Sequence, residues 1–388
     1  MRMNRKSALL MIAYTYYQSD PRVIREAEAA VSGGFEVDFF ALRREREPAI
    51  EEIRGVRVYH LHQSRYRGKG HLRYLLSYLG FFVRCFFKAT ALFLKQRYRI
   101  IHVNNMPDFL VFSTLIPKLL GARIVLDIHD PMPNTFASKF KSGERGFFFR
   151  ILLWQERLSV WYADRTLTVH EPVKTGVLVK HGLRADSIHT ICNFADEEVF
   201  RLQPTYAVDG KVRLAFHGTI LERYGLRNLI LALAQMQHRD KIEVKIIGEG
   251  DFSRSLRELI ARLGLQGVVQ FDNRSYPVYE IPRLLADCNL GLVPLEISSI
   301  TNYALPLKLL EYTSLGLPVV TVRNAAITYY FSEEDCLFYQ WDDPASLAAV
   351  LDRVAHEPAL LLPRRQKAVA LREKFLWGKE KVYLIMVV

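Results

Sequence analysis

The chain has 388 residues, enough for two domains that each bury a core, and a half-hydrophobic composition typical of globular rather than disordered proteins. Its net charge of +12 is concentrated, since eleven Lys and Arg residues and no acid lie between Arg54 and Pro107. A uniformly basic surface for nucleic acid is therefore not expected. Four scattered cysteines without a CxxC argue against a disulfide framework or structural zinc and favour a reducing compartment.

The first predicted element is a buried strand, Leu9–Tyr14, followed by a helix over Asp20–Ser32. The run SALLMIAY is interpreted as this strand and not as a secretory signal, because no small-residue cleavage site follows before Asp20. Asp20, or a neighbouring amide, is expected to cap the helix. Alternating apolar and helix-length stretches then predict strands at Val37–Ala41, Val56–Leu61, Ile100–Asn104, Arg123–Ile128, Thr166–Val169 and Ile188–Cys192.

The acid-free segment 65–99 is rich in Leu, Phe and Tyr and is flanked by basic clusters. Arg84 and Lys88 in its middle argue against a transmembrane helix, because they would lie near the bilayer centre. An amphipathic helix on an anionic membrane surface fits the pattern, with each basic residue contributing about 1 kcal/mol. The alternative is a helix packed in the N-terminal domain with a solvated basic face.

A polar group, Asp127, His129 and Asp130, follows the buried strand in GARIVLDIHDP. Ligands of open α/β sheets bind outside the carboxyl ends of the strands, which makes these residues site candidates. The alternative is a capping or core polar cluster. DxHD offers metal-ligand types, but no second His or Cys group completes a set, so no metal is expected.

The strand–helix pattern restarts after Asn193. Residues 194–211 are polar and contain Pro204 and Gly210, so they are interpreted as a linker between domains 1–193 and 212–375. The pattern predicts two doubly wound, Rossmann-like α/β domains with parallel sheets facing across a cleft. The second domain is expected to contain strands Val212–His217, Val244–Ile247, Val268–Phe271, Leu290–Pro294, Val319–Val322 and Leu337–Tyr339, and helices Leu226–Gln237, Phe252–Leu263 and Pro306–Leu315.

Two glycine turns in the second half are candidate anion sites. Gly218 and Thr219 lie between a strand and a helix, where backbone amides and the helix dipole attract negative charge. Arg223 in the same turn offers a charge-assisted hydrogen bond to phosphate, although any βα turn with a surface arginine has this pattern. Gly248 begins a GxG that lets a ligand approach the backbone, but the complete GxGxxG dinucleotide fingerprint is absent.

The strongest local pattern is ALPLKLLEYTSLGLPVVTV. Pro306 suits a first helical turn, and Gly316 followed by Pro318 suits the helix end. The amides of Leu307 and Lys308 fall in the first turn, where they can point at a diphosphate. Lys308 and Glu311 share a helical face, and Glu311 offers a carboxylate to two ribose hydroxyls. An exposed Lys–Glu pair is the alternative.

Together the blocks FHGTILERYG, IIGEGDFSRSL, VVQFDN, LLADCNLGLVP and PLKLLEYTSLGLPVV resemble the C-terminal half of GT4-family retaining glycosyltransferases, which have the GT-B fold. They cover nearly the whole second domain in the family's order. The opening LLMIAYTYYQSDPRVIREAEAAVSGGFEVDFF resembles the family's first βαβ unit in its Asp-Pro-Arg variant. The C-terminal residues 376–388 resemble the last GT-B helix, which crosses back onto the first domain.

The resemblance implies roles for several residues. Arg223 and Lys308 would hold the donor diphosphate, Glu311 the ribose, and the stretch around Asn273 the base. His129 would contact the donor sugar, with Asp20 and Asp130 on the acceptor side. No cofactor or metal is implied, because basic side chains and helix ends do that work in GT-B enzymes.

Two departures from the family pattern leave the sugar contacts open: Tyr224-Gly225 stands where many relatives have Lys-Gly, and Tyr303 where many have a first glutamate. The predicted partners are a UDP- or GDP-sugar, a glycan or lipid-linked acceptor, and an anionic membrane surface through 65–99, with no nucleic acid. The expected location is cytoplasmic, on the inner face of the cell membrane. A sugar-nucleotide epimerase and a non-catalytic GT-B scaffold remain alternatives, and a Rossmann dehydrogenase is least favoured.

Overall fold

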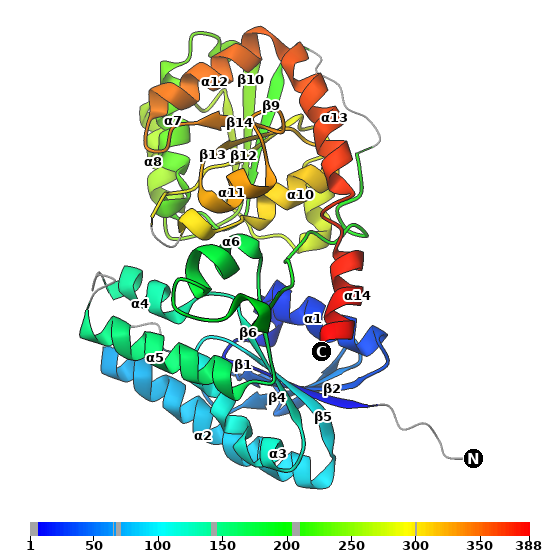
Figure 1. The fold of residues 1–388 in the computed structure, drawn as a ribbon. Coiled ribbons are helices and arrows are strands. Elements are labelled where there is room, and N and C mark those ends of the chain that lie inside the picture. The colour runs from blue at the N-terminus through cyan, green and yellow to red at the C-terminus, as the bar shows by residue number, and fades with distance from the viewer. Residues whose placement is uncertain (1–6, 65, 67–70, 141–145, 204–209, 299–300) are drawn as a thin grey trace. The chain divides into compact units, whose positions relative to one another are not determined.

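The structure is a computed structural model that describes residues 7–64, 66, 71–140, 146–203, 210–298 and 301–388 (Figure 1). The chain divides into two compact units, one of residues 1–193 with 379–388 and one of residues 194–378. Each unit is built on one largely parallel sheet, as the alternating sequence pattern predicts.

The sheet of the first unit has the strand order β3-β4-β2-β1-β5-β6-β7-β8. All neighbours pair in parallel except β3, which lies antiparallel to β4 at the edge. Strand β3 was not predicted from the sequence, because its residues IEEI carry two glutamates and lack a buried face. The strands are β1 Ala8–Ala13, β2 Glu36–Leu42, β3 Ile50–Ile53, β4 Val56–Leu61, β5 Tyr98–Asn104, β6 Arg123–Ile128, β7 Arg165–Thr168 and β8 Ile188–Thr190.

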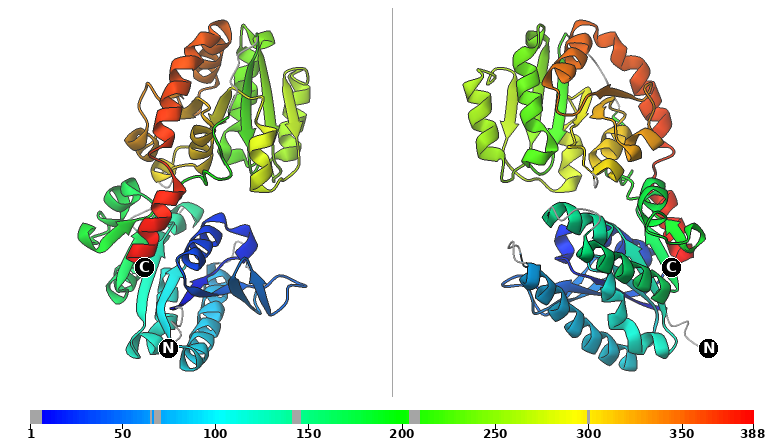
Figure 2. Two further views of the ribbon diagram at one scale, coloured as in Figure 1. Left: turned by 90° about the vertical axis from the view of Figure 1, so that its right-hand side faces the viewer. Right: turned by 60° about the vertical axis from the view of Figure 1, so that its left-hand side comes forward.

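Helices cover both faces of this sheet (Figure 2). The helical connection from β1 to β2 and the one from β4 to β5 cross the sheet in opposite directions. Because such crossovers are right-handed, these two helices lie on opposite faces. The helical elements are α1 Pro21–Ser32, α2 His71–Lys95, η2 Asp108–Thr114, α3 Leu115–Leu119, α4 Met132–Phe140, α5 Phe147–Tyr162, α6 Glu171–Val173 and η3 Lys174–Leu178.

The last helix, α14 (Trp377–Val387), contributes its residues from Lys379 onward to the first unit. Its Ile385 side chain packs against Gly33 at the end of α1, where an added Cβ would lie 3.0 Å from Ile385 Cδ1. Glu380 accepts a hydrogen bond from the Cys192 amide at 3.0 Å. These contacts attach the C-terminal segment to the sheet that begins the chain.

The second unit has a six-stranded parallel sheet in the order β11-β10-β9-β12-β13-β14. Its core is built from the inward side chains of β9, β10 and β12 and the apolar faces of α7, α8 and α12. The strands are β9 Val212–His217, β10 Ile242–Ile247, β11 Val269–Asp272, β12 Leu290–Val293, β13 Val319–Val322 and β14 Cys336–Tyr339. The helices are α7 Leu226–Gln235, α8 Ser253–Arg262, α9 Ile281–Leu284, α10 Leu307–Leu315, α11 Ala325–Tyr330, α12 Pro344–His356 and α13 Leu361–Arg372.

The segment interpreted as a linker is partly packed. Residues 204–209 lie outside the described residues, but Phe194 and Phe200 before them are buried in the second unit. The Phe194 ring packs at 5.3 Å from that of Phe375. Although residues 194–211 are mostly polar, two phenylalanines therefore attach the start of this segment to the second unit.

Candidate functional site

Two glycines at the strand ends of the second unit lie against each other. Gly218 follows β9 with φ 110°, and Gly248 follows β10 with φ 143°, backbone conformations that favour glycine. A Cβ on Gly248 would lie 1.9 Å from the Gly218 carbonyl oxygen, so no larger residue fits without a backbone shift. A Cβ on Gly218 would lie 2.9 Å from Lys308 Cε. The structure thus brings together Gly218, Gly248 and Lys308, which are far apart in sequence.

Lys308 makes no ion pair with a carboxylate among the described residues. Its ammonium lies 5.0 Å from the ring centre of Phe216 and 4.8 Å from that of Tyr224. Among the described residues, no carboxylate oxygen lies within ion-pair distance of this nitrogen. Burial lowers the pKa of Lys308, and the nearby Glu311 only partly offsets this effect. A desolvated ammonium of this kind favours an incoming anion.

Arg223 shares the Tyr224 ring with Lys308. It lies on the short helix η5 (Glu222–Tyr224), is exposed, and has its guanidinium carbon 5.4 Å from the ring centre. The two cations that sequence reasoning singled out are therefore placed around one aromatic side chain. Tyr224, which departs from the pattern of many relatives, is the side chain that links them.

Helix α10 starts beside this pair of cations. Pro306 is its N-cap rather than its first helical residue, a small correction to the predicted helix, and Gly316 ends it with φ 74°. The amides of Leu307 and Lys308 belong to the first turn, which has no intrahelical acceptors. The positive end of the helix dipole and these amides therefore add to the charge of Lys308.

Glu311 lies one turn deeper on α10 and is buried. Its carboxylate oxygen lies 3.2 Å from His217 Nε2, at the end of β9. The His217 ring packs edge-on against Tyr312, 5.3 Å between centres. The alternative of an exposed Lys–Glu pair is wrong, because Glu311 is 5% exposed and faces an imidazole rather than Lys308.

The remaining donor-side candidates lie at the ends of β9 and β11. Thr219 is exposed directly after Gly218. Asn273 follows β11, and its side-chain oxygen is buried without a hydrogen-bond partner among the described residues. Asp272 beside it is bound by Arg274 at 2.8 Å and by the Tyr276 hydroxyl at 2.6 Å. The loop is thus held by its own polar contacts while one amide oxygen of Asn273 stays unsatisfied.

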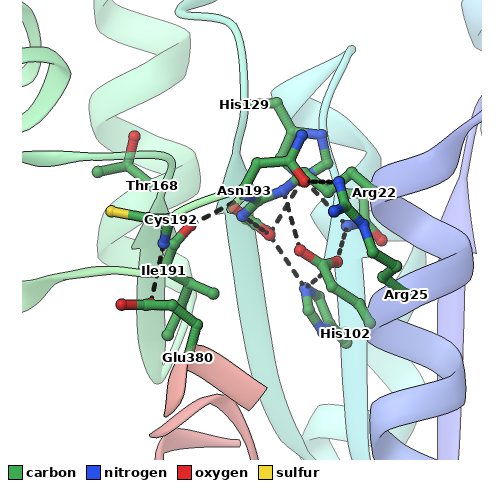
Figure 3. A network of polar contacts seen from close by, with 12 residues as sticks. Arg22, Arg25, His102, His129, Thr168, Ile191, Cys192, Asn193 and Glu380 are labelled. Carbon is green, nitrogen blue, oxygen red and sulfur yellow. Dashed lines mark hydrogen bonds and ion pairs between the residues drawn. The ribbon is translucent and has the colours of Figure 1, made fainter. Parts of the chain in front are cut away.

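In the first unit, His129 belongs to a buried polar network (Figure 3). Its Nε2 lies 3.0 Å from an Asp127 oxygen, and its backbone amide donates to Asn105 at 2.9 Å. Arg22 on α1 donates to the same Asp127 oxygen at 2.8 Å and to the Ile191 carbonyl at 3.0 Å. Burial opposes the charge on His129, but Asp127 outweighs it and raises the His129 pKa.

The network continues inward from Arg22. Glu26, one turn along α1, lies 2.9 Å from Arg22 Nε and accepts from Asn104 at 2.9 Å. His102 on β5 lies 3.6 Å from Asp127. Burial raises the pKa of Glu26, whereas Arg22 and His129 hold the pKa of Asp127 well below its usual range despite burial. The positive charge of Arg22 offsets the cost of burying these two carboxylates.

Glu26, Asp127 and His129 offer ligand atoms that all lie within 4.8 Å of one another. The sequence did not predict Glu26 as a member of such a set. The Arg22 guanidinium, however, already contacts both carboxylates at 2.8 and 2.9 Å. The position between these carboxylates is therefore held by a side-chain cation, and the residues fit a positioning network for His129 better than a metal site.

The acceptor-side candidates lie at the edges of this network. Asp20 occupies the N-cap position of α1, as predicted, but its side chain makes no capping hydrogen bond. The chain enters α1 through Pro21, whose missing N–H removes one demand for a cap. Asp130 is exposed, and its carbonyl accepts from Asn105 at 2.7 Å.

Sequence reasoning missed several residues of these two polar clusters. Arg22 and Glu26 are spaced i, i+4 and lie beside the apolar stripe of Val23 and Ala27 on α1. Charged residues on a buried helix face indicate a network of paired charges, so the roles of Arg22 and Glu26 in such a network could have been predicted from the sequence. His217 and Asn104, by contrast, end strands whose neighbours are known only once the sheet order is known.

Two α/β units with parallel sheets are the architecture of the GT-B class of glycosyltransferases. Residues 22–199 match the family model described as Glycosyltransferase Family 4, and residues 211–357 match the model described as Glycosyl transferases group 1. The chain belongs to the GT4-type glycosyltransferases. The family expected from the sequence blocks is thereby confirmed.

Solved structures with the same fold include a sucrose-phosphate synthase from Thermosynechococcus elongatus, with 18% identity, a TM-score of 0.75 and 98% of each chain covered. HepE from Anabaena in complex with UDP-glucose matches at 14% identity and a TM-score of 0.71, covering 97% of this chain and 98% of its own. WaaG, a glycosyltransferase involved in lipopolysaccharide biosynthesis, matches at 13% identity and a TM-score of 0.70, covering 98% and 99%. These matches confirm the predicted GT-B fold. No curated protein sequence matches the chain.

Proposed function

We propose that this glycosyltransferase is a retaining enzyme that moves a sugar from a nucleotide diphosphate to a glycan or lipid-linked acceptor. The observation that carries the proposal is the Lys308 ammonium, which lies over Phe216 and Tyr224 with no carboxylate within reach among the described residues. Such a cation, next to glycine backbone and a helix start, suits a diphosphate. The complex of HepE with UDP-glucose supports a nucleotide-sugar donor and favours UDP over GDP as its nucleotide.

In the proposed reaction, the bond between the anomeric carbon and the β-phosphate oxygen breaks. The acceptor hydroxyl forms the new glycosidic bond from the same face, and its proton passes to the departing diphosphate. Negative charge grows on that diphosphate, where Lys308, Arg223 and the first-turn amides of α10 stabilise it. Because these groups supply the positive charge, the proposed reaction requires no divalent ion. His129 and Asp130 are proposed to act on the sugar and acceptor side.

The acceptor is proposed to be a cell-surface or lipid-linked glycan, with the enzyme held at the inner face of the membrane. Within the described residues, the helical segment Arg73–Lys95 is long and apolar enough to cross a membrane. However, α2 packs one stripe of that segment into the first unit, through Phe81, Cys85, Ala89 and Phe93. A helix fixed to the sheet in this way suits a position on the membrane surface. Residues 65 and 67–70 of the predicted membrane-binding segment lie outside the described residues.

Nucleotide binding tests the proposal directly. We expect UDP or GDP to bind the wild-type protein in a calorimetric titration, and Lys308→Met to weaken binding by about 10²-fold, as for a lost charge-assisted contact. Methionine keeps the aliphatic contact with Phe216 and Tyr224 but removes the charge. Arg254→Met is the matched control, because Arg254 pairs with Glu258 on the exposed face of α8.

Equal nucleotide binding by wild type and Lys308→Met would remove the proposed donor site. Absence of binding in wild type would favour the non-catalytic scaffold. Conversion of a UDP-sugar without any acceptor would favour an epimerase. A donor screen by thermal shift then chooses between UDP- and GDP-sugars, and chelation of divalent ions should leave turnover unchanged.

A further inference from the structure

The largest group of exposed apolar side chains in the described residues lies on one face of the first unit. The helices α2, α3 and α5 all pack around η2, and α2 and α5 lie side by side in both views of this face (Figures 1 and 2). Patches of this extent mark interaction surfaces in soluble proteins. The exposed side chains are Leu75, Leu76, Leu79, Val83, Phe87 and Leu94 from α2, Leu115, Leu119 and Leu120 in and after α3, and Phe147, Phe148, Ile151, Trp154 and Trp161 from α5.

The contribution of α5 is a regular aromatic stripe. Phe147, Trp154 and Trp161 recur every seven residues, so they lie on one face of the helix, two turns apart. They are 74%, 65% and 80% exposed. The opposite face of α5 buries Phe149 and Glu156. Within the described residues, α5 packs into the core of the unit through this other face, and the aromatic stripe stays outside that core.

Charge indicates what covers this stripe. Arg150 is exposed on α5, and the one acid in the helix, Glu156, is buried and lies 2.7 Å from His181. The neighbouring α2 contains no acid and carries Arg73, Arg84, Lys88 and Lys95. A second copy of the same face would bring like charges together. An anionic lipid surface instead complements the basic residues and takes the exposed aromatic and leucine side chains.

We propose that the Phe147–Trp154–Trp161 stripe of α5 is a membrane anchor, which inserts among the headgroups of an anionic bilayer while α2 lies beside it. Tryptophan and phenylalanine suit this depth, because an apolar ring enters the acyl boundary while the indole N–H stays in the hydrated layer. The anchor holds the enzyme at the membrane that contains the proposed lipid-linked acceptor, and in that respect it rests on the proposed function. Membrane binding itself does not require the donor site.

Vesicle binding of the full chain tests the anchor. We expect flotation with vesicles that contain anionic lipid and a blue shift of tryptophan emission on binding. Brominated lipid should quench this emission, because Trp154 and Trp161 are exposed, whereas the other two tryptophans, Trp341 and Trp377, are respectively partly buried and buried in the second unit. The variant F147S/W154S/W161S should bind at least about tenfold more weakly, since it removes three large apolar groups from the contact. The matched control, Y279S/Y329S, removes similarly exposed aromatic rings from the second unit and should bind as wild type.

A conservative variant keeps the test independent of folding defects. W154F/W161F retains apolar rings and should still float, but without the blue shift or the quenching. Absence of bromolipid quenching in wild type, or equal flotation of F147S/W154S/W161S and wild type, would overturn the anchor. So would self-association by light scattering, without vesicle binding, that the triple serine variant abolishes. UDP binding measured without vesicles reports on the donor site separately, so failure of either proposal can be recognised.

Discussion

A buried cation in the first unit and a half-buried one in the second show opposite electrostatic arrangements. Arg22 in the first unit contacts Asp127 at 2.8 Å and Glu26 at 2.9 Å, and these carboxylates raise its pKa although burial opposes its charge. Lys308 in the second unit rests on aromatic rings, and burial lowers its pKa. The first charge is balanced within the protein, whereas the second is balanced only weakly.

The difference separates a positioning role from a binding role. A fully paired guanidinium fixes Asp127, and through it the His129 ring, in one arrangement. An ammonium without a carboxylate costs stability in the free protein and recovers it when an anion binds. Sites built to bind a ligand are often destabilised in this way. The two cations should therefore respond in opposite ways when their charge is removed.

The largest expected effect comes from Arg22→Met. The substitution removes the guanidinium that contacts both Asp127 and Glu26 and leaves only imidazoles near these buried carboxylates, which should lower the free energy of unfolding by about 3–5 kcal/mol. Urea unfolding at neutral pH measures this effect. Arg254→Met, which breaks an exposed pair, should change the same quantity by less than about 1 kcal/mol. A similar small effect in both variants would show that Arg22 does not balance the network.

Asp108 is the opposite case to Lys308: it is a buried acid that makes no ion pair among the described residues, and it predicts a pH effect on stability. Asp108 in η2 is fully buried, and burial together with the nearby Glu156 raises its pKa to about 8. Between pH 4 and 8 the unfolded chain loses this proton while the folded chain keeps it. Stability should therefore fall as pH rises through this window, by up to about 1.4 kcal/mol per unit. Asp108→Asn should match wild type near pH 4 and exceed it at pH 8 in thermal unfolding.

A flat difference between Asp108→Asn and wild type across this pH range would contradict the assignment. Asparagine keeps the oxygen that accepts from Asn105 at 2.8 Å, so the substitution preserves the local hydrogen bond. Glu156 lies 2.7 Å from His181, and the substitution leaves this pair unchanged. The variant therefore isolates the proton on Asp108.

Most of the fold was predictable because parallel strands buried on both faces are near-continuous apolar runs. The predicted strands Val56–Leu61, Arg123–Ile128, Val212–His217 and Val319–Val322 agree with the structure at both ends. The edge strand β3 escaped because an edge needs no apolar face. The start of α10 shifted by one residue because a proline suits both the N-cap and the first turn.

The site was predictable only in part. Lys308 and Glu311 share a helix, so their proximity follows from spacing, and Gly218 stands out after a strand. The Phe216–Lys308–Tyr224 contacts and the Arg22–Asp127 contact join residues between 84 and 105 positions apart in sequence. Such contacts depend on strand order and side-chain direction, which no local pattern encodes. The exposed stripe of α5 escaped because helical periodicity alone does not tell which apolar face is buried.

The unpaired state of Lys308 predicts a gain of stability on removing its charge. Lys308→Met should raise the free energy of unfolding of the unliganded protein by about 1 kcal/mol, because the desolvated ammonium is lost and the apolar stem kept. Since burial lowers the Lys308 pKa, the unfolded chain binds this proton more tightly. Wild-type stability should therefore rise with pH, and the gain should shrink toward the usual lysine range. Destabilisation by Lys308→Met would mean that its charge is balanced within the protein.

The smallest expected effect tests the ring that the two donor-side cations share. Tyr224→Leu removes the aromatic face beneath Lys308 and Arg223, each contact being worth about 0.5–1 kcal/mol, but keeps an apolar side chain. Nucleotide binding should weaken by roughly three- to tenfold in calorimetry, because neither cation is held in place. Tyr224→Phe keeps the ring and should bind as wild type. Weak binding by Tyr224→Phe as well would assign the effect to the hydroxyl, and the two cations would then not depend on the shared ring for their position.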